Sequence, residues 1–275
     1  MALRPILYHI FPKPLPYLPA LALQERIHSI QARSRDHDKP PSQTALQMST
    51  HPDILLLLEH RPVYTAGRRQ DAQELDEERR RLEKSGAEWV ATQRGGETTY
   101  HGPGQIVGYP LFDLTRMGIR TRDHVCRTQT LLKNFVQQRH HVPVYESAHT
   151  GVFFSDTEKL ASIGMQVRHG LTSHGFAINI TSEPLSWFNQ VVACGLADVR
   201  AASIQSAKEK SNEKGQELDI LQERKVLAKM YGEVYGTGIE PLSPQQEEIW
   251  DAVKEVEEIA NKAGDWPRAP VRSIN

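Results

Sequence analysis

The run from Arg94 to Leu114, RGGETTYHGPGQIVGYPLFDL, constrains the fold more than any other part of this chain. Glycines at 95, 96, 102 and 104 precede an alternation of apolar residues that is typical of a strand. Glycine lets the backbone approach an extended ligand closely and offer N–H groups to it. Glycine-rich turns between strands are also common, so the composition of this run leaves a ligand site and a plain turn open.

Several functional classes are disfavoured by the sequence as a whole. The run contains neither G-x-x-x-x-G-K-[ST] nor a G-x-G-x-x-G that opens a helix, so nucleotide binding is not indicated. The 33 basic and 34 acidic residues give a net charge of −1, which provides no global field for nucleic acid or an anionic membrane. With 39% apolar residues, no apolar run approaches the roughly 20 residues that span a bilayer.

The amino-terminal segment is basic and nearly free of acidic residues, as a mitochondrial transit peptide would be. Five prolines before residue 20 break any amphipathic helix there. The simpler interpretation is a folded strand at 6–11, followed by an amphipathic helix after Pro19 that has Leu23, Ile27 and Ile30 on one face.

Hydrophobic periodicity predicts the remaining elements. These are a buried strand at 53–60, a solvated helix or loop at 71–86 closed by Gly86, a helix at 121–141, an antiparallel meander of strands at 151–154, 159–168 and 174–180, helix-like spacing at 184–195, and a helix at 244–264 in a carboxy-terminal tail. The charged, aromatic-free stretch 206–219 is interpreted as an exposed insertion or mobile loop. Helices without a regular βαβ repeat, together with antiparallel strands, indicate an α+β fold.

Two cysteines are present, which is too few for a disulfide framework or a metal-site spacing and favours a reducing compartment. Cys126 lies beside Val125 in the amphipathic helix and reads as a small buried hydrophobe. Cys194 ends a short apolar segment directly before Gly195, where a side chain can emerge from a turn. Taken alone, either cysteine is more often buried than nucleophilic.

Lys159 is a second candidate for chemistry, because it begins a strand whose following residues are mainly apolar. A lysine near a thiol stabilises the thiolate and so lowers the pKa of the thiol. Lysines at strand starts are normally solvated, and nothing in the spacing of Lys159 and Cys194 requires them to meet.

Together these residues resemble the lipoyl(octanoyl) transferases, also called octanoyl-acyl carrier protein:protein octanoyltransferases. The resemblance covers roughly residues 6 to 204 and resumes near VLAKMYGEVYG. It rests on LLLEHRPVYTAGRR (56–69), the run from Arg94, GVFFSDTEKLASIGMQVRHGLTSHGFAINI (151–180) and ACGL (193–196). The resemblance implies the catalytic-domain fold of the biotin and lipoyl protein ligases, an α+β arrangement of a mixed β-sheet with packed helices.

The resemblance also implies roles for individual residues. Cys194 matches the acyl-accepting nucleophile, and Lys159 matches the lysine that depresses the pKa of this thiol. The residues that match substrate-binding segments are Arg94, Gly95, Gly96, Glu97, Thr98, Thr99, Tyr100, His101, Ser162, Ile163, Gly164, Gly175, Phe176 and Ala177. Glycines such as Gly96 and Gly102 are expected to form a wall of the acyl pocket that has no room for a new side chain.

The chain departs from the family's pattern at a few positions. Ala193 stands where the family usually has proline, Ala202 and Ser203 stand where it has a Thr-Ser pair, and Glu97 replaces a commoner glutamine. The predicted organisation is an octanoyltransferase catalytic domain at 1–242, with a charged insertion at about 205–220, and a helical tail at 243–275.

The resemblance implies a reaction and its partners. A thiolate takes octanoyl from octanoyl-acyl carrier protein, and an acceptor lysine then takes it from the thioester, with no ATP and no cofactor or metal. The expected acceptors are lipoyl domains of 2-oxo acid dehydrogenase complexes and the glycine cleavage H protein. Because these partners are typically acidic, a local basic patch including Arg68, Arg69 and Arg94 is expected to steer them.

Two other functions remain open from the sequence. One is an ATP-dependent lipoate or biotin ligase of the same fold, which would need an adenylate and no cysteine. The other is a non-catalytic protein that binds acyl groups or lipoyl domains. No nucleic-acid partner and no membrane span are expected. The insertion and the tail favour the mitochondrial matrix, with the cytoplasm as the alternative for a bacterial protein.

Overall fold

The computed structural model describes residues 4–36, 51–68, 70, 72–191, 198–211 and 218–271. Within these residues the main sheet has eight strands. Seven of them lie side by side in the order β10 (Arg200–Ala201), β8 (Glu158–Arg168), β9 (Leu171–Asn179), β6 (Gln105–Leu111), β2 (Ile54–Leu58), β1 (Ile6–Ile10) and β11 (Ile239–Pro241). The eighth, the two-residue strand β7 (Val152–Phe153), also pairs with β8. The predicted α+β class is confirmed, because this sheet is mixed and helices cover it.

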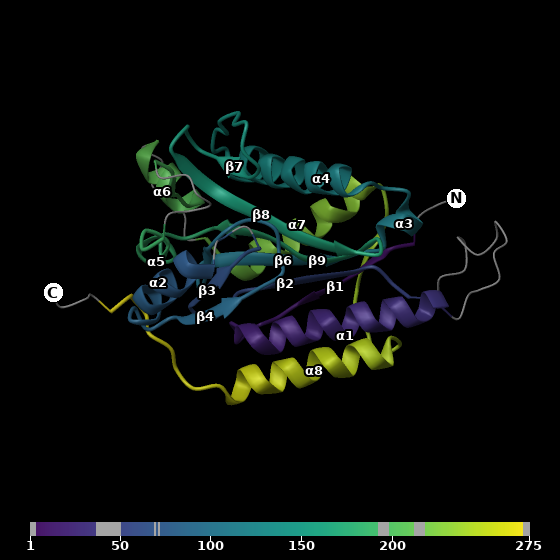
Figure 1. Cartoon of the computed structure of the whole chain (residues 1–275). Coiled ribbons are helices and arrows are strands. Elements are labelled where there is room, and N and C mark those ends of the chain that lie inside the picture. The colour runs from purple at the N-terminus through teal and green to yellow at the C-terminus, as the bar shows by residue number, and fades with distance from the viewer. Residues whose placement is uncertain are drawn as a thin grey trace.

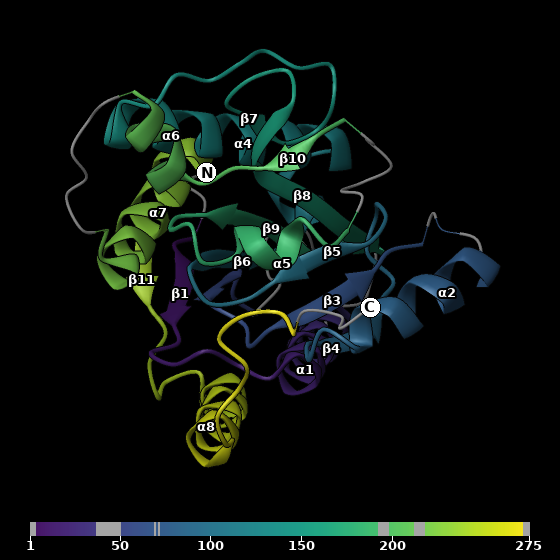
Figure 2. The same ribbon diagram turned by 90° about the vertical axis from the view of Figure 1, so that its left-hand side faces the viewer.

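Helices pack on both faces of the main sheet (Figure 1). The helices are α1 (Tyr17–Asp36), α2 (Ala72–Glu83), α3 (Leu114–Met117), α4 (Thr121–Asn134) with a π-helical extension (Phe135–Arg139), α5 (Leu185–Phe188), α6 (Ile204–Lys210), α7 (Ile220–Tyr235) and α8 (Glu247–Lys262). Figure 2 shows α1 and α8 together on one side of the sheet and α4, α6 and α7 on the other. None of the described helices is long and apolar enough to cross a membrane.

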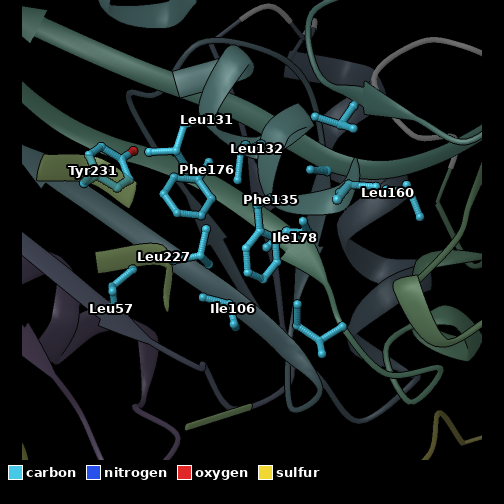
Figure 3. Packing of buried hydrophobic residues seen from close by; sticks show 14 of the residues in the cluster. Leu57, Ile106, Leu131, Leu132, Phe135, Leu160, Phe176, Ile178, Leu227 and Tyr231 are labelled. Carbon is cyan, nitrogen blue, oxygen red and sulfur yellow. The ribbon is translucent and has the colours of Figure 1, made fainter. Parts of the chain in front are cut away.

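Two hydrophobic clusters fill the layers between the sheet and the helices. The cluster between the sheet and helices α4 and α7 is shown in Figure 3, where Leu57, Ile106, Leu131, Leu132, Phe135, Leu160, Phe176, Ile178, Leu227 and Tyr231 are labelled. Strand β2 contributes to both clusters, since Leu55 and Leu57 face one and Ile54, Leu56 and Leu58 the other. A strand buried on both faces reads as a continuous apolar run, which explains why ILLLL does not alternate.

A second, three-stranded sheet carries the glycine-rich run. Its order is β4 (Glu88–Ala91), β3 (Val63–Ala66) and β5 (Thr99–His101), with β5 antiparallel to β3. The chain leaves β4, passes through the loop that contains Arg94, returns along β5 and turns at Gly102 to Gly104 into β6. This path brings the run from the small sheet to the middle of the main sheet.

The amino-terminal prediction is confirmed with one correction. The strand and the amphipathic helix are both present, but α1 begins at Tyr17 and not after Pro19. Pro19 therefore lies in the first turn, where the missing N–H removes no intrahelical hydrogen bond. The antiparallel meander is also confirmed, because β8 pairs antiparallel with both β7 and β9.

The interpretation of residues 206–219 as a loop is wrong for its first part. Residues 204–210 form α6, whose amino terminus has a capping box between Ser203 and Ser206. Ile204 and Ala207 are buried in the hydrophobic cluster between the main sheet and helices α4 and α7. Their burial and the capping box hold the helix in place despite its charged sequence. Residues 212–217 of the predicted insertion lie outside the described residues.

The carboxy-terminal helix is present and packs alongside α1, with side chains that also reach β1, where His9 Nε2 lies 2.9 Å from Glu257 Oε1. Val253 and Val256 of α8 lie in the same cluster as Leu23 and Ile27 of α1. Beyond α8 the chain continues to the small sheet, where Arg61 donates hydrogen bonds to the carbonyls of Gly264 and Asp265 at 2.6 and 2.7 Å. Helix α8 is therefore part of the hydrophobic cluster that also contains α1, although its exposed face is strongly charged.

Candidate functional site

A cavity lies where the Arg94 loop and β5 meet strands β6, β8 and β9. About 460 Å³ of space inside it is free of atoms, part of which is open to solvent. Most residues predicted to bind substrate line this cavity, although they come from segments far apart in the sequence. They are Arg94, Gly95, Gly96, Thr99, His101, Ser162, Ile163, Gly164, Gly175, Phe176 and Ala177.

Three of the predicted substrate-binding residues do not line the cavity. Tyr100 is fully buried elsewhere, with its ring stacked on Trp187 at 5.6 Å between centroids. The Thr98 hydroxyl lies 2.7 Å from Gln70 Oε1 and 2.6 Å from Glu78 Oε2, so this side chain contacts α2 and the segment just before it. Glu97 is half-buried and is not among the lining residues. Direct contact of these three with a substrate stays a prediction.

Four lining residues were missed from the sequence: Tyr17, Val107, Tyr109 and His174. The sequence does contain a signal for Val107 and Tyr109. They lie two and four residues after Gln105 in β6, and side chains two residues apart in a strand point to the same face. Tyr17 comes from the start of α1, and only the tertiary packing of this helix brings it to the cavity. No local signal in the sequence marks it.

Arg94 is a structural part of the cavity wall. Its side chain is buried, and Nη2 donates to the Thr65 hydroxyl at 2.9 Å while Nη1 donates to the Gly95 carbonyl at 3.1 Å. The Gly95 N–H in turn donates to the Met165 carbonyl of β8 at 3.2 Å. The expectation that Arg94 belongs to a surface patch is therefore wrong. Arg68 is exposed, and Arg69 lies outside the described residues.

A second, smaller cavity adjoins the first and contains Lys159. About 250 Å³ of space inside it is free of atoms, part of which is open to solvent, and Ser162 and Ala177 line both cavities. Lys159 is only 7% exposed, and its Nζ lies 5.2 Å from the centre of the Phe153 ring. The structure thus places Lys159 in a cavity next to the one lined by the predicted substrate-binding residues.

The predicted nucleophile, Cys194, lies outside the described residues. The chain that follows it re-enters at Asp198, and β10 then pairs in parallel with β8, with Arg200 opposite Glu158 and Ala201 opposite Lys159. Cys126, which was interpreted as a buried hydrophobe, is exposed on α4, because the buried face of this helix contains Thr128, Leu131 and Leu132 instead.

The histidines around the larger cavity are kept neutral by burial. Burial lowers the pKa of His60 and of His174 to about 4 each and holds the pKa of His101 well below its usual range. His60 Nδ1 lies 3.2 Å from the Leu15 carbonyl, which can only accept, so Nε2 accepts from the Tyr109 hydroxyl at 2.6 Å. The imidazoles therefore add hydrogen-bonding groups to the cavity region without adding charge.

The expectation that Gly102 is a wall of the pocket is wrong. A Cβ at this position would lie 2.0 Å from the Tyr100 hydroxyl oxygen, so glycine is required there for packing. Gly96 does line the cavity, but its φ of +93° favours glycine whatever the space around it. Gly95 has neither constraint, because a Cβ there would meet only the Met165 carbonyl at an ordinary 3.4 Å.

A solved structure of lipoate-protein ligase A bound with ATP superposes with a TM-score of 0.60 at 15% identity, covering 97% of this chain and 98% of that one. At this identity the likeness shows the fold, which is the one expected from the sequence. The sequence profile of the lipoyl protein ligase A/B catalytic domain matches residues 16–227, and the chain belongs to this family.

Among its relatives are proteins named octanoyltransferase. One from Caldicellulosiruptor saccharolyticus is 32% identical over 236 residues, which are 85% of this chain and 91% of that protein. A mitochondrial octanoyltransferase of Arabidopsis thaliana is 35% identical over 192 residues, which are 68% of this chain and 73% of that protein. The resemblance to octanoyltransferases is confirmed.

Replacing Gly102 by alanine should destabilise the fold. The new methyl group would overlap the buried Tyr100 ring, and overpacking of this kind typically costs about 1–3 kcal/mol. Urea unfolding measures the loss. Gly264→Ala is the matched control, because a Cβ there meets nothing within 4 Å and should leave the unfolding free energy unchanged. Equal stability of the two variants would contradict the packing described for Gly102.

The stability of the protein should fall as the pH decreases from 7 to 5. The pKa of His60 is about 4 in the folded chain and 6.5 in the unfolded chain, so the unfolded state binds more protons in this window. This residue alone should account for about 2 kcal/mol of lost unfolding free energy between pH 7 and pH 5. We expect His60→Gln to show a shallower dependence and the exposed His149→Gln to keep the wild-type one. Parallel curves for all three proteins would disprove the role of His60.

Proposed function

We propose that this protein transfers an octanoyl group from octanoyl-acyl carrier protein to a lysine of lipoyl domains, through a thioester on Cys194. The observation that carries this proposal is that the glycine-lined cavity and the cavity lined by Lys159 are neighbours, with Ser162 and Ala177 in the walls of both. An acyl chain in the larger cavity would have its reacting end directed along β8 and β9 toward this lysine. Membership of the lipoyl protein ligase A/B family and the octanoyltransferase relatives support the choice of acyl group.

The energetics of the larger cavity suit an apolar chain. Val107, Phe176 and Ala177 contribute apolar surface, and the glycines let the chain lie close to backbone. Burial of each methylene contributes roughly 0.8 kcal/mol, so an octanoyl group gains several kcal/mol before the cost of ordering it is deducted. This free energy contributes mainly to substrate binding. The chemical step requires a nucleophile in addition.

The chemical step follows from a thiolate and a nearby cation. The Cys194 thiolate attacks the donor thioester carbonyl, and the tetrahedral adduct collapses with release of the carrier as a thiolate, which solvent protonates. The neutral amine of the acceptor lysine then attacks the new thioester; the bond to the Cys194 sulfur breaks, the thiolate is released and the amine loses a proton to solvent, which leaves a stable amide. Lys159 supplies the positive charge that favours the thiolate over the thiol. Chain connectivity supports this pairing, because Ala201, seven residues after Cys194, is the strand partner of Lys159.

The proposed partners are octanoyl-acyl carrier protein as donor and, as acceptors, the lipoyl domains of 2-oxo acid dehydrogenase complexes and the glycine cleavage H protein. A mitochondrial matrix location is proposed on the basis of the Arabidopsis relative, which is described as mitochondrial. Arg68 is the one described member of the proposed steering patch that is exposed.

The thioester should be found on Cys194. Incubation with octanoyl-acyl carrier protein, without ATP, is expected to add one octanoyl group that peptide mass spectrometry locates at Cys194. Cys194→Ser should lose transfer to a lipoyl domain while it melts at the wild-type temperature. The control is Cys126→Ser, which removes the exposed thiol of α4 and should keep full activity. An adduct on Cys126, or transfer that requires ATP, would overturn the proposal.

Removing the charge of Lys159 should raise the pKa of the Cys194 thiol. We expect Lys159→Ala to react more slowly with iodoacetamide near neutral pH and to recover most of the rate as the pH rises, because the thiolate then forms without help. Lys159→Arg keeps the charge and should show a smaller change. Lys229→Ala, at an exposed position of α7, is the control. A wild-type profile for Lys159→Ala from pH 6 to pH 10 would remove Lys159 from this role.

A further inference from the structure

A chain of buried hydrogen bonds links the two cavities. His101 Nδ1 lies 2.7 Å from Gln105 Oε1, and Gln105 Nε2 donates to Asn179 Oδ1 at 2.9 Å. Asn179 Nδ2 donates to the Ala202 carbonyl at 2.9 Å. His101 lines the larger cavity, whereas Gln105 and Asn179 line the cavity that contains Lys159. All three side chains are more than nine-tenths buried.

The direction of every bond in this chain is fixed by backbone carbonyls, which can only accept. Gln105 Nε2 also faces the Tyr100 carbonyl at 3.2 Å, so the amide nitrogen must be on that side and the amide oxygen must face His101. The Ala202 carbonyl orients Asn179 in the same way. His101 Nδ1 must therefore carry the proton, which leaves Nε2 of the neutral ring as an acceptor.

We propose that Gln105 is a positioning residue that, with Asn179, holds His101 in the Nδ1–H form, so that Nε2 is a hydrogen-bond acceptor for a substrate group at the larger cavity, which His101 lines. The inference rests on the proposed function. An octanoyl chain has no hydrogen-bond donor, so the group that uses this acceptor must belong to the thiol, the pantetheine amide or the attacking amine. Nothing in the octanoyl chain itself requires a histidine with this tautomer.

The surroundings of His101 keep the ring neutral. Burial is the main cause of its low pKa, and three groups on other segments add to it: His60 after β2, Arg94 in the loop and His174 on β9. Tyr17 of α1 lies parallel to the ring at 6.3 Å between centroids. The Gln105 hydrogen bond acts in the opposite direction and raises the pKa of His101, but burial outweighs it. A neutral ring with one fixed tautomer is the result.

Gln105→Glu tests the proposal, because it keeps the shape and changes the protons. The second oxygen of the new carboxyl takes the place of Nε2 and faces the Tyr100 carbonyl, which can only accept, so a protonated carboxyl donates there and leaves the proton on Nδ1. An ionised carboxyl instead stabilises the imidazolium beside it, and Nε2 then carries a proton. From this ion pair the acceptor returns when the pair loses its extra proton at higher pH. We expect at least a tenfold loss at pH 6, in acylation of Cys194, in transfer to a lipoyl domain or in both, and recovery of most of the rate by pH 9.

Gln222→Glu is the matched control, because it makes the same change at an exposed position of α7 and should keep the wild-type pH profile. A loss for Gln105→Glu that is equal at all pH values would show a structural role only, and wild-type rates at pH 6 would show no role. Either result would overturn the proposal.

An independent measurement needs no substrate. Nitrogen-15 NMR of the imidazoles, with His101 assigned by its absence in His101→Gln, should show a protonated Nδ1 and an unprotonated Nε2 in the wild type at pH 7. The Nε2–H form in the wild type would overturn the proposal. Because this spectrum is recorded without donor or acceptor, it separates failure of the His101 geometry from failure of octanoyl transfer, which the Cys194 adduct reports.

Discussion

The buried carboxylate of Glu59 joins the elements on which the site is built. One oxygen accepts from the Gly104 N–H at 2.8 Å and the other from Arg224 of α7 at 3.2 Å. Arg224 also donates to the Phe11 carbonyl at the end of β1. The Glu59 side chain, directly after β2, thus contacts α7 and the turn at Gly104 that leads into β6, and through Arg224 it is connected to the end of β1. This turn lies between His101, which lines the larger cavity, and Gln105, which lines the smaller one.

This ion pair specifies geometry more than it adds stability. Burial raises the pKa of Glu59 in spite of Gly104 and Arg224, which shows that desolvation outweighs its partners. Replacing a buried pair by apolar residues is often neutral, whereas removal of one partner leaves an unpaired charge and costs about 3–5 kcal/mol. The carboxylate therefore acts as a constraint on the path of the chain, and the surrounding hydrophobic clusters supply most of the stability.

The sequence predicted the elements whose patterns are local and missed the contacts that are not. Strand β2 and helix α4 follow from apolar spacing within a few residues. The Arg94 run could be assigned to a ligand site because its residue types are specific, but the burial of Arg94 depends on Thr65 in a different strand. Tyr17 was missed for the same reason, since only the docking of α1 on the sheet brings it to the cavity. The charged composition of residues 206–219 predicted a loop, but a capping box and two buried residues stabilise helix α6 over residues 204–210.

The distribution of charge explains how a cavity so rich in polar groups can suit an apolar chain. His101 and His174 are neutral because burial makes protonation costly, and the Arg94 guanidinium is already bonded to Thr65 and Gly95. Among the described residues that line the two cavities, the lysine is Lys159, in the smaller cavity. An alkyl chain entering the larger cavity leaves the hydrogen bonds of these wall residues intact, while the charge stays where a thiolate would need it. Under the proposed function, this separation along β8 and β9 would let neighbouring cavities bind an apolar group and activate a nucleophile.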